Sequence, residues 1–488
     1  MLHDSTAFYT AYAARDARFD GVFFIGVTST GIYCRPICTA RTPKAANCRF
    51  FDSAAAAEKA NFRPCLRCRP ELAPGNAPVD DARRIAALVA RRIEEGMADG
   101  DAGLEQIAAK FGWSSRQIRR MVQKELGVSP IELVQTRRLL LAKQLLTETS
   151  LPVAQVAYAS GFASLRRFND AFNKRYGMAP SRFRRAADDV AAVPRTAASL
   201  VLRLGYRPPF DWRAMLDFLG ARATAGVESV DGDAYLRTVA LGDRTGWVRV
   251  VDRPSQHALA VEASDGLVSL LPALLGRLRQ LFDLDARPDV IAEHLAADSR
   301  LRPLVAAAPG LRVPGAFDGF ELALRAIIGQ QITVKAATTL ASRVMTTFGD
   351  QLETAHDALT RVTPTAARLA VARVDDVASL GIVRARATTI VALAREVADG
   401  RLMLEPGADP EATIAQLVAL PGIGAWTANY IALRALRWAD AFPKEDVVLR
   451  KQLGGVTARD AEAVSQAWRP WRSYATLHLW RSASRTQG

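Results

Sequence analysis

The sequence contains no long apolar run, and its cysteines are confined to one short stretch. No segment of the 488 residues approaches the roughly eighteen apolar side chains of a membrane-spanning helix, so we expect no membrane partner. The first residues, MLHDSTAFYTAYAARDARFDG, lack an apolar signal core, so we expect a cytoplasmic location. Cysteine is absent after Cys68, and all five cysteines lie between Cys34 and Cys68. Such clustering favours a metal site over a disulfide framework.

Acidic residues are too few to balance the basic ones. There are 50 Asp and Glu against 64 Lys and Arg, which gives a formal net charge of +14. Residues 110–185 alone hold fifteen basic and four acidic side chains, a net charge of +11. A merely basic proteome would spread its charge evenly, whereas a local excess indicates a surface that docks on a polyanion. Nucleic acid is therefore the expected partner.

An internal repeat lies inside this basic region, which has a helical pattern from about residue 80 to 185. Each copy predicts a helix, a tight turn at Gly, a second helix and then Gly-x-x-Pro, as in a helix-turn-helix. The stretches ELAPGNAPVD and ADDVAAVPRTAAS flank the region and are typical of linkers. The first copy contains Ala108, Gly112, Gly127 and Pro130, and these recur 49 to 50 positions later as Ala157, Gly161, Gly177 and Pro180.

The second half of the chain begins with a β pattern and ends with a helical one. Three runs, Tyr235–Leu241, Trp247–Val251 and His257–Val261, are rich in β-branched and apolar residues and predict an antiparallel meander. From Pro314 onward the pattern is helical, with breaks at Gly381, Gly400 and Pro421-Gly422. The fold class expected from these patterns is multidomain.

The cysteine spacing predicts a zinc site. Cys34 and Cys38 are separated by three residues, Cys65 and Cys68 by two, and twenty-six residues lie between the pairs. Two close cysteine pairs are typical of a tetrahedral thiolate site for one Zn²⁺. Cys48 stands alone between the pairs and is expected to be no ligand. A purely structural zinc site remains the alternative to a reactive one.

The words around these cysteines, GIYCRPICTAR and NFRPCLRCRP, resemble the N-terminal domain of the Ada-type methyltransferases over residues 5 to 72. The resemblance implies a small α/β domain in which the thiolate of Cys34 takes a methyl group from a DNA methylphosphotriester. It also places Arg35 and Arg41 near the flanking phosphates. The second, cysteine-dependent methyltransferase domain of that family is absent, so we expect no reversal of O6-methylguanine.

Residues 80 to 186 resemble the DNA-binding module of AraC-type regulators, an all-α domain with two helix-turn-helix units. The resemblance implies a connecting helix at about Ile131 to Thr147 and second helices at Ser114–Lys124 and Ser164–Arg175, each entering a major groove. With the Ada-type domain it implies a methylation-responsive transcription activator, for which RNA polymerase is a candidate partner. Candidate DNA contacts are Arg116, Arg119, Arg120, Arg166, Arg167 and Asn169, and predicted core positions are Ile107, Phe111, Ile118, Val156, Phe162, Phe168 and Phe172.

LPGIGAWTANY, residues 420 to 430, has the form of a helix-hairpin-helix. Its glycines, Gly422 and Gly424, allow backbone N–H groups and a helix start to approach a DNA phosphate. Many DNA-binding proteins use this motif only as a clamp. Here Asp446 follows Gly424 by twenty-two residues in FPKEDVVLRKQL, the context in which the helix-hairpin-helix glycosylases carry their essential aspartate.

Residues 200 to 484 resemble the AlkA-type 3-methyladenine glycosylases in PPFDWRAMLDFLGAR, AFDGFELALRAIIGQQ and WRPWRSYATLHLW. The resemblance implies an α+β glycosylase in which Asp446 stabilises the sugar cation. Lyase-type relatives carry Lys at the position of Trp426, so we expect no strand cleavage. The endonuclease III branch has a cysteine-ligated iron–sulfur cluster, which this chain cannot ligate. Gln331 occupies the DNA-wedge position where the family often has Leu, and Val447 follows the aspartate where Tyr can occur. Trp468 and Trp471 are predicted core, and the base pocket is expected to be lined by Phe218, Trp426, Tyr430 and Trp480.

Together these features predict a DNA alkylation repair protein that combines sensor, regulator and base-excision enzyme. The hydrolase is expected to release bases such as 3-methyladenine and 7-methylguanine from double-stranded DNA. The alternative is a transcription activator whose glycosylase half only binds DNA. The predicted domains are 1–75 (zinc, methyl acceptor), 80–186 (AraC-type), 187–198 (linker), 199–312 (β-rich glycosylase subdomain) and 313–488 (helix-hairpin-helix catalytic domain).

Overall fold

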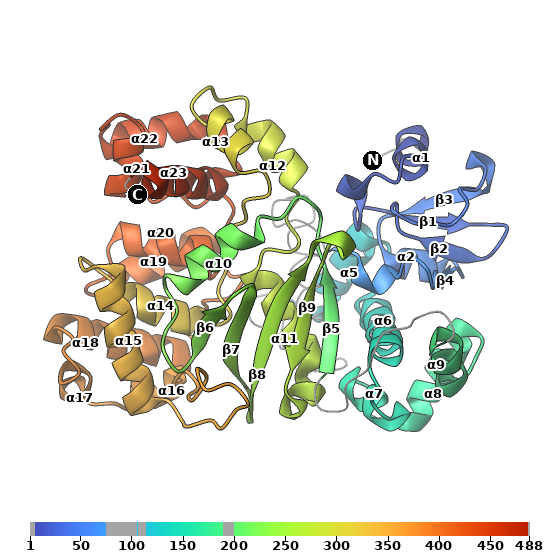
Figure 1. Ribbon diagram of the computed structural model, residues 1–488, viewed down its shortest axis with the longest axis horizontal. Coiled ribbons are helices and arrows are strands. Elements are labelled where there is room, and N and C mark those ends of the chain that lie inside the picture. The colour runs from blue at the N-terminus through green and yellow to red at the C-terminus, as the bar shows by residue number, and fades with distance from the viewer. Residues whose placement is uncertain (1–4, 75–104, 106–113, 189–199, 487–488) are drawn as a thin grey trace. The chain divides into compact units, whose positions relative to one another are not determined.

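The computed structural model describes residues 5–74, 105, 114–188 and 200–486. The chain forms two compact units. Figure 1 colours the chain by residue number from the N-terminus in blue to the C-terminus in red. The first unit contains Met1–Pro208 and Arg253–Gly276, and the second contains Pro209–Asp252 and Arg277–Gly488. Each unit combines helices with β-strands, in agreement with the multidomain fold class expected from the sequence.

The N-terminal part of the first unit is a small α/β fold around a four-stranded sheet with the strand order β3-β1-β2-β4. β1 is antiparallel to both β2 and β3, whereas β2 runs parallel to β4. Apolar side chains such as Phe23 and Ile25 are completely buried and hold helix α1 against the sheet. The elements are α1 (Ser5–Ala13), β1 (Phe24–Val27), β2 (Ile32–Cys34), β3 (Cys48–Phe51), α2 (Ala54–Lys59) and β4 (Arg63–Pro64).

Among the described residues 114–188, the helices are α5 (Ser115–Leu126), α6 (Pro130–Glu148), α7 (Val153–Ala159), α8 (Leu165–Tyr176) and α9 (Pro180–Asp188). The repeat is visible in their caps, because Gly127 and Gly177 both end a helix with φ of 70°. Ser114 and Ser164 begin those helices and accept a backbone hydrogen bond from the residue three positions later. The predicted second helices and the long connecting helix are confirmed, whereas Ala108, Gly112, Ile107 and Phe111 lie outside the described residues.

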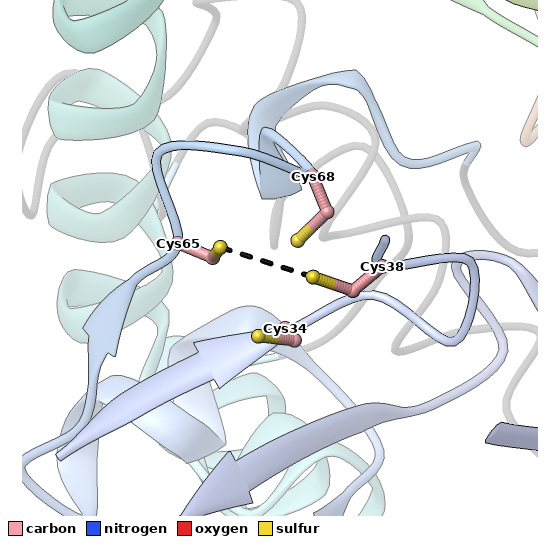
Figure 2. A group of neighbouring side chains, drawn as sticks. All are labelled: Cys34, Cys38, Cys65 and Cys68. Atoms are coloured by element: carbon pink, nitrogen blue, oxygen red, sulfur yellow. Dashed lines mark hydrogen bonds between the residues drawn. The ribbon is translucent and has the colours of Figure 1, made fainter. Parts of the chain in front are cut away.

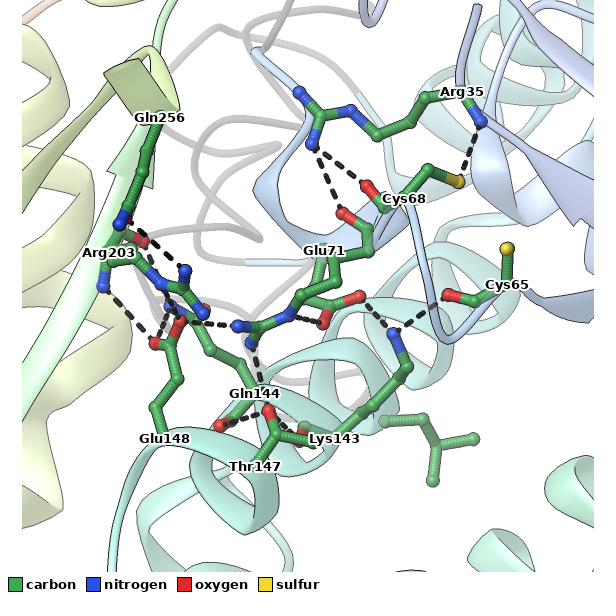
Figure 3. Close-up of polar contacts among 12 residues, drawn as sticks. Arg35, Cys65, Cys68, Glu71, Lys143, Gln144, Thr147, Glu148, Arg203 and Gln256 are labelled. Carbon is green, nitrogen blue, oxygen red and sulfur yellow. Dashed lines mark hydrogen bonds and ion pairs between the residues drawn. The ribbon is translucent and has the colours of Figure 1, made fainter. Parts of the chain in front are cut away.

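A buried ionic network joins the loop that carries Cys65 and Cys68 to α6 (Figure 3). Lys143 of α6 pairs with Glu71 and donates to the backbone carbonyl of Cys65 at 3.3 Å. Arg69 binds both Glu71 at 3.0 Å and Glu148 at 2.8 Å. Burial raises the pKa of Glu148 to about 7, although Arg69 opposes the shift. Because breaking such a network leaves an unpaired buried charge, it fixes the cysteine loop rigidly on α6.

The predicted β pattern is confirmed and forms two groups of antiparallel strands. In the first unit, β5 (Leu200–Gly205) pairs with β9 (Ala258–Ala263). The second unit contains β6 (Glu228–Asp231) and β7 (Ala234–Leu241), and β7 also pairs with β8 (Arg244–Arg253). The predicted domain boundaries stay predictions.

The second unit is mainly helical and has a core around α14, α18 and α20, where side chains such as Ile327, Ile390 and Ile431 are completely buried. Across the described ranges, no helix is long and apolar enough to cross a membrane. The helices from this point on are α10 (Trp212–Gly220), α11 (Leu271–Leu281), α12 (Pro288–Leu295), α13 (Arg302–Ala307), α14 (Gly319–Ile328), α15 (Val334–Phe348), α16 (Ala366–Ala370), α17 (Val374–Ala378), α18 (Arg384–Ala398), α19 (Pro410–Ala419), α20 (Ala425–Arg434), α21 (Val447–Gln452), α22 (Ala458–Ser465) and α23 (Arg472–Thr486).

Candidate functional site

Four cysteines converge at the end of β2, as Figure 2 shows. The sulfur atoms of Cys34, Cys38, Cys65 and Cys68 all lie within 4.8 Å of one another, and Cys38 and Cys65 are separated by 4.0 Å. Tetrahedral zinc–thiolate bonds of about 2.3 Å place the sulfurs roughly 3.8 Å apart, so the arrangement fits one Zn²⁺. Cys48 lies outside the group, where its thiol approaches the carbonyl of Lys44. The predicted ligand set and its odd cysteine are confirmed.

The prediction for Arg35 is wrong. Its side chain is only 7% exposed, forms an ion pair with Asp20 and donates to the carbonyl of Cys68 at 3.0 Å. Its backbone N–H also donates to the sulfur of Cys68 at 3.3 Å. Arg35 therefore positions the zinc ligands instead of facing a phosphate, whereas Arg41 is exposed as expected.

The predicted DNA-reading side chains lie on α5 and α8. Arg116 and Arg120 are exposed on α5, and Arg119 is half-buried. On α8, Arg166 and Arg167 are exposed together with Asn169. The buried side of α5 contains Ile118, and that of α8 contains Phe168 and Phe172. The predicted core residues Val156 on α7 and Phe162 in the turn before α8 are buried as well. One face of each helix is thus free for a groove and the other is packed.

The two glycines of the hairpin at residues 420–425 are explained by different features of the local structure. Gly422 adopts φ of 90°, and a Cβ atom there would lie 2.3 Å from the hydroxyl oxygen of Thr389. That hydroxyl is held in place because it donates to the carbonyl of Pro421 at 2.7 Å. Gly424 is the N-cap of α20, and the space beside it is open. The exposed start of α20 is therefore accessible to an anion such as a phosphate.

Asp446 is 7% exposed and is the N-cap of α21. Its Oδ1 accepts from the backbone N–H of Leu449 at 2.7 Å, and its Oδ2 accepts from Nε1 of Trp426 at 2.7 Å. Two hydrogen bonds from different elements hold the carboxylate in one orientation. The sequence indicated both residues but not this hydrogen bond, which spans twenty positions along the chain.

Aromatic rings continue from Trp426 along the same side of α20. The rings of Trp426 and Tyr430 are stacked, with centroids 5.4 Å apart and an angle of 6° between planes. The ring of Trp480 on α23 lies 6.3 Å from that of Tyr430. The fourth predicted pocket residue, Phe218 on α10, is joined to them by Arg434, which lies over both Phe218 and Tyr430. The structure thus brings the four predicted aromatics into one cluster.

Two arginines in this cluster were missed by the sequence prediction. Arg222 lies 3.9 Å from the ring centroid of Phe218, and Arg434 donates to the hydroxyl of Tyr430 at 2.8 Å. Arg222 follows Phe218 by four residues, and Arg434 follows Tyr430 by four residues. A four-residue spacing at or near a helix places side chains together, so this spacing was the available signal.

Gln331 lies between α14 and α15 with an exposed side chain and a left-handed backbone at φ of 56°. Its neighbour Gln330 donates to the carbonyl of Gly422 at 2.9 Å and to the hydroxyl of Thr427 at 3.1 Å. These hydrogen bonds attach the turn between α14 and α15, which contains Gln331, to the hairpin at residues 420–425. A non-glycine residue in this strained conformation is a feature often found at functional sites.

Trp468 and Trp471 are 0% and 6% exposed, so their predicted core positions are confirmed. The helix that carries Trp480 also buries His478, and this burial lowers the pKa of the imidazole to about 4.

The pKa of His478 makes the stability of the second unit depend on pH. A depressed folded-state pKa stabilises the fold above the unfolded pKa of about 6.5, and this contribution is lost as the pH falls toward 4. We expect the free energy of unfolding to decrease by about 2 kcal/mol between pH 6.5 and pH 5 from this group alone. Urea unfolding of His478→Gln should lack that decrease, whereas the exposed control His257→Gln should retain it. The same pH dependence in both variants would contradict the assignment.

Models of four protein families match successive parts of the chain. Residues 7–71 match the metal binding domain of Ada, and residues 107–186 match a helix-turn-helix domain. Residues 201–318 match the AlkA N-terminal domain, and residues 324–473 match the HhH-GPD superfamily of base excision DNA repair proteins.

Individual relatives cover the same regions. A Mycobacterium tuberculosis protein named "Probable bifunctional transcriptional activator/DNA repair enzyme AlkA" is 41% identical over 485 residues, 98% of this chain and 97% of its own. DNA-3-methyladenine glycosylase 2 of Escherichia coli is 36% identical and covers 57% of this chain and 95% of its own. The solved 3-methyladenine DNA glycosylase of Archaeoglobus fulgidus has the same fold, with a TM-score of 0.50, 21% identity and coverage of 58% of this chain and 98% of its own.

Proposed function

This chain belongs to the family of bifunctional transcriptional activator/DNA repair enzymes named AlkA, and from that membership we propose that it repairs alkylated DNA by two separate chemistries. Its C-terminal half is a DNA glycosylase of the helix-hairpin-helix superfamily and acts on DNA. We propose that this half excises bases alkylated on a ring nitrogen, such as 3-methyladenine and 7-methylguanine. The observation that supports this most is the carboxylate of Asp446, held by Trp426 beside the aromatic cluster.

The proposed excision needs little acid catalysis. A base methylated on a ring nitrogen is cationic, and its glycosidic bond is already weak. The nucleotide must leave the duplex, for which we propose Gln331 as the wedge and Gly422 and Gly424 as phosphate contacts. Trp426, Tyr430 and Trp480 then offer electron-rich faces to the base. Asp446 stabilises the positive charge that grows on the sugar.

For the N-terminal domain we propose stoichiometric methyl transfer to Cys34. The sulfur of Cys34 forms a bond to the methyl carbon while the carbon–oxygen bond of the phosphotriester breaks, which leaves a DNA phosphodiester. Bound Zn²⁺ keeps the sulfur deprotonated at neutral pH. Cys38, Cys65 and Cys68 hold the site, and Arg35 fixes the loop that carries Cys68.

For regulation we propose that α5 and α8 contact promoter DNA through Arg116, Arg119, Arg120, Arg166 and Arg167, with RNA polymerase as the partner of the activator. Because chromosomal DNA is the proposed substrate, we further propose that the protein works in the bacterial cytoplasm at the nucleoid. We propose that each predicted domain has its own role: methyl acceptance in 1–75, promoter binding in 80–186, and base excision in 199–312 together with 313–488.

One reaction tests these proposals. Purified protein is incubated with methylated duplex DNA, and released bases, strand integrity and protein-bound methyl are measured together. We expect free methylated purines, intact abasic strands and one methyl group per chain. Borohydride should trap no covalent complex, because Trp426 provides no amine for a Schiff base. Absence of released bases would favour an activator whose glycosylase half only binds DNA, and a trapped adduct on a Lys in residues 200–488 would contradict the hydrolase mechanism.

A further inference from the structure

The first strand of the part that matches AlkA lies in the same compact unit as the cysteine site. Residues 201–318 match the AlkA N-terminal domain, and β5 belongs to the first unit with the four cysteines. The backbone of β5 runs close to the segment after Cys68, because a Cβ atom at Gly205 would lie 2.0 Å from the carbonyl oxygen of Leu72. Strand β5 therefore packs against the chain that directly follows the loop of Cys65 and Cys68.

Arg207, two residues after β5, is connected to Cys68 by a short series of hydrogen bonds. The Arg207 side chain is almost completely buried, and its Nε donates to the backbone carbonyl of Asp20 at 2.8 Å. The carboxylate of Asp20 accepts from Nε of Arg35 at 2.7 Å. Arg35 then donates from its side chain to the carbonyl of Cys68 and from its backbone N–H to the sulfur of Cys68. Arg207 thus holds the backbone of the residue that orients Arg35.

Arg203, within β5, is connected to Cys65 through the ionic network of Figure 3. Its Nε donates to Oε1 of Glu148 at 2.7 Å, and its backbone N–H donates to Oε2 of the same residue at 3.2 Å. Its backbone carbonyl accepts from Nε2 of Gln144 at 2.9 Å. Glu148 also pairs with Arg69, and the network continues from there to the backbone carbonyl of Cys65. Both cysteines of the loop are therefore connected to an arginine in or next to β5.

The carboxylate of Glu148 depends on both of its arginines because it is buried. Its Oε1 lies 2.7 Å from Nε of Arg203 and 2.8 Å from Nη1 of Arg69. A buried carboxylate that loses one cation is less well compensated for its desolvation, so its ionised form and its hold on the remaining cation weaken. Removal of Arg203 should therefore loosen Arg69. Because Arg69 directly follows Cys68 in the chain, the change reaches the cysteine loop.

We propose that Arg203 and Arg207 are positioning residues for the methyl-transfer site, which they support by fixing the loop of Cys65 and Cys68. The inference rests on the proposed methyl transfer to Cys34. Both arginines lie in the AlkA match, whereas the match to the metal binding domain of Ada ends at residue 71. The site of methyl transfer thus depends on a strand from the part of the chain that is proposed to excise bases.

The chemistry of the site explains why this support matters. Groups that hold metal ligands in place typically change metal affinity or activity about 10- to 100-fold when they are removed. Two of the four sulfur ligands belong to the loop that the arginines support. A looser loop should release Zn²⁺ faster, and the sulfur of Cys34 would then lose the ion that keeps it deprotonated.

The test uses the full chain loaded with Zn²⁺ and three measurements: zinc release to a chromophoric chelator, methyl uptake from methylphosphotriester DNA, and release of 7-methylguanine. Arg207→Met should speed zinc release and slow methyl uptake, each about 10- to 100-fold. Arg203→Gln should change both about three- to tenfold, because more residues separate Arg203 from the metal ligands. Release of 7-methylguanine should stay within about twofold, because Asp446 and the aromatic cluster belong to the second unit.

Two matched variants serve as controls. Arg203→Lys keeps the positive charge beside Glu148 and should restore most of the zinc retention. Arg253→Gln removes an exposed arginine from the same unit and should change none of the three measurements. Thermal unfolding shows whether each variant folds, and Arg203→Gln, whose side chain is partly exposed in the wild type, keeps the test decisive if Arg207→Met does not fold.

Zinc release and methyl uptake that match the wild type in the folded variants would overturn this inference. Equal losses of zinc retention, methyl uptake and base release would also overturn it, because they would indicate a general loss of structure. A wild-type protein that retains Zn²⁺ but takes up no methyl would instead overturn the proposed methyl transfer, while faster zinc release from the variants would still support their role at the cysteine site.

Discussion

Asp446→Asn is expected to lower the rate of base excision by about 10²–10³ while DNA affinity stays within a few fold. Loss of one preorganised electrostatic group in an active site typically costs about 3–4 kcal/mol of transition-state stabilisation. Asparagine still has an oxygen that accepts from the N–H of Leu449, and it caps a helix about as well as aspartate. The variant should therefore fold, and single-turnover release of 3-methyladenine measures the missing charge directly.

Trp426 provides the matched control for this variant. The asparagine amide would present an N–H group to Nε1 of Trp426, which would then have no acceptor, at a cost of about 1–3 kcal/mol in the free energy of unfolding. In Trp426→Phe/Asp446→Asn that mismatch is absent, so the two stability losses should not add. Excision should stay as low in the double variant as in Asp446→Asn. Recovery of excision together with stability, or release of the base by Asp446→Asn at more than about a tenth of the wild-type rate, would refute the assigned role.

The sequence predicted those parts of the site that are local in the chain. The metal site is one such part. Two pairs of cysteines that are close in the sequence are typical of four ligands to a single metal ion, and here the pairs are Cys34 with Cys38 and Cys65 with Cys68. The hairpin is also determined by neighbouring residues. Gly422 has a φ of 90° and no room for a Cβ atom, so the turn between Pro421 and Ile423 needs a glycine. Burial of Trp468 and Trp471 was expected because core packing is the usual role of a tryptophan, and both side chains are buried.

Partners distant in the chain were not predictable. Arg35 was expected to face DNA because it adjoins a reactive cysteine. Instead it forms a buried ion pair with Asp20, fifteen residues earlier in the chain. In the same way, the amino-acid pattern could not show that Oδ2 of Asp446 meets the indole of Trp426 or that Arg434 reaches Tyr430. The sequence gives the charge of a side chain, but the direction in which the side chain points depends on how helices and strands pack against one another.

Cys34→Ala is expected to abolish methyl uptake completely and with it any gain in promoter affinity. Four thiolates around one divalent cation carry a net charge of about −2, and a methylated Cys34 reduces this to about −1. Two unit charges at roughly 6 Å and an effective dielectric of about 20 interact by 2–3 kcal/mol, so less repulsion from the DNA backbone should strengthen binding. After screening we expect about a tenfold gain in operator affinity for wild-type protein, with one methyl on Cys34 by mass spectrometry and none on Cys48.

The buried network around Lys143 indicates how this gain should arise. Lys143 and Arg69 tie the loop of Cys65 and Cys68 to α6, so a methyl group on Cys34 should change charge without moving the helices. A purely electrostatic gain must shrink with salt, because the Debye length falls from about 10 Å at 0.1 M to about 3 Å at 1 M. Operator affinity before and after methylation, measured across that range with Cys48→Ala as the matched control, tests both statements. A gain that is independent of salt would require a structural rearrangement, and an unchanged affinity after confirmed methylation would reject the regulatory proposal while leaving methyl transfer intact.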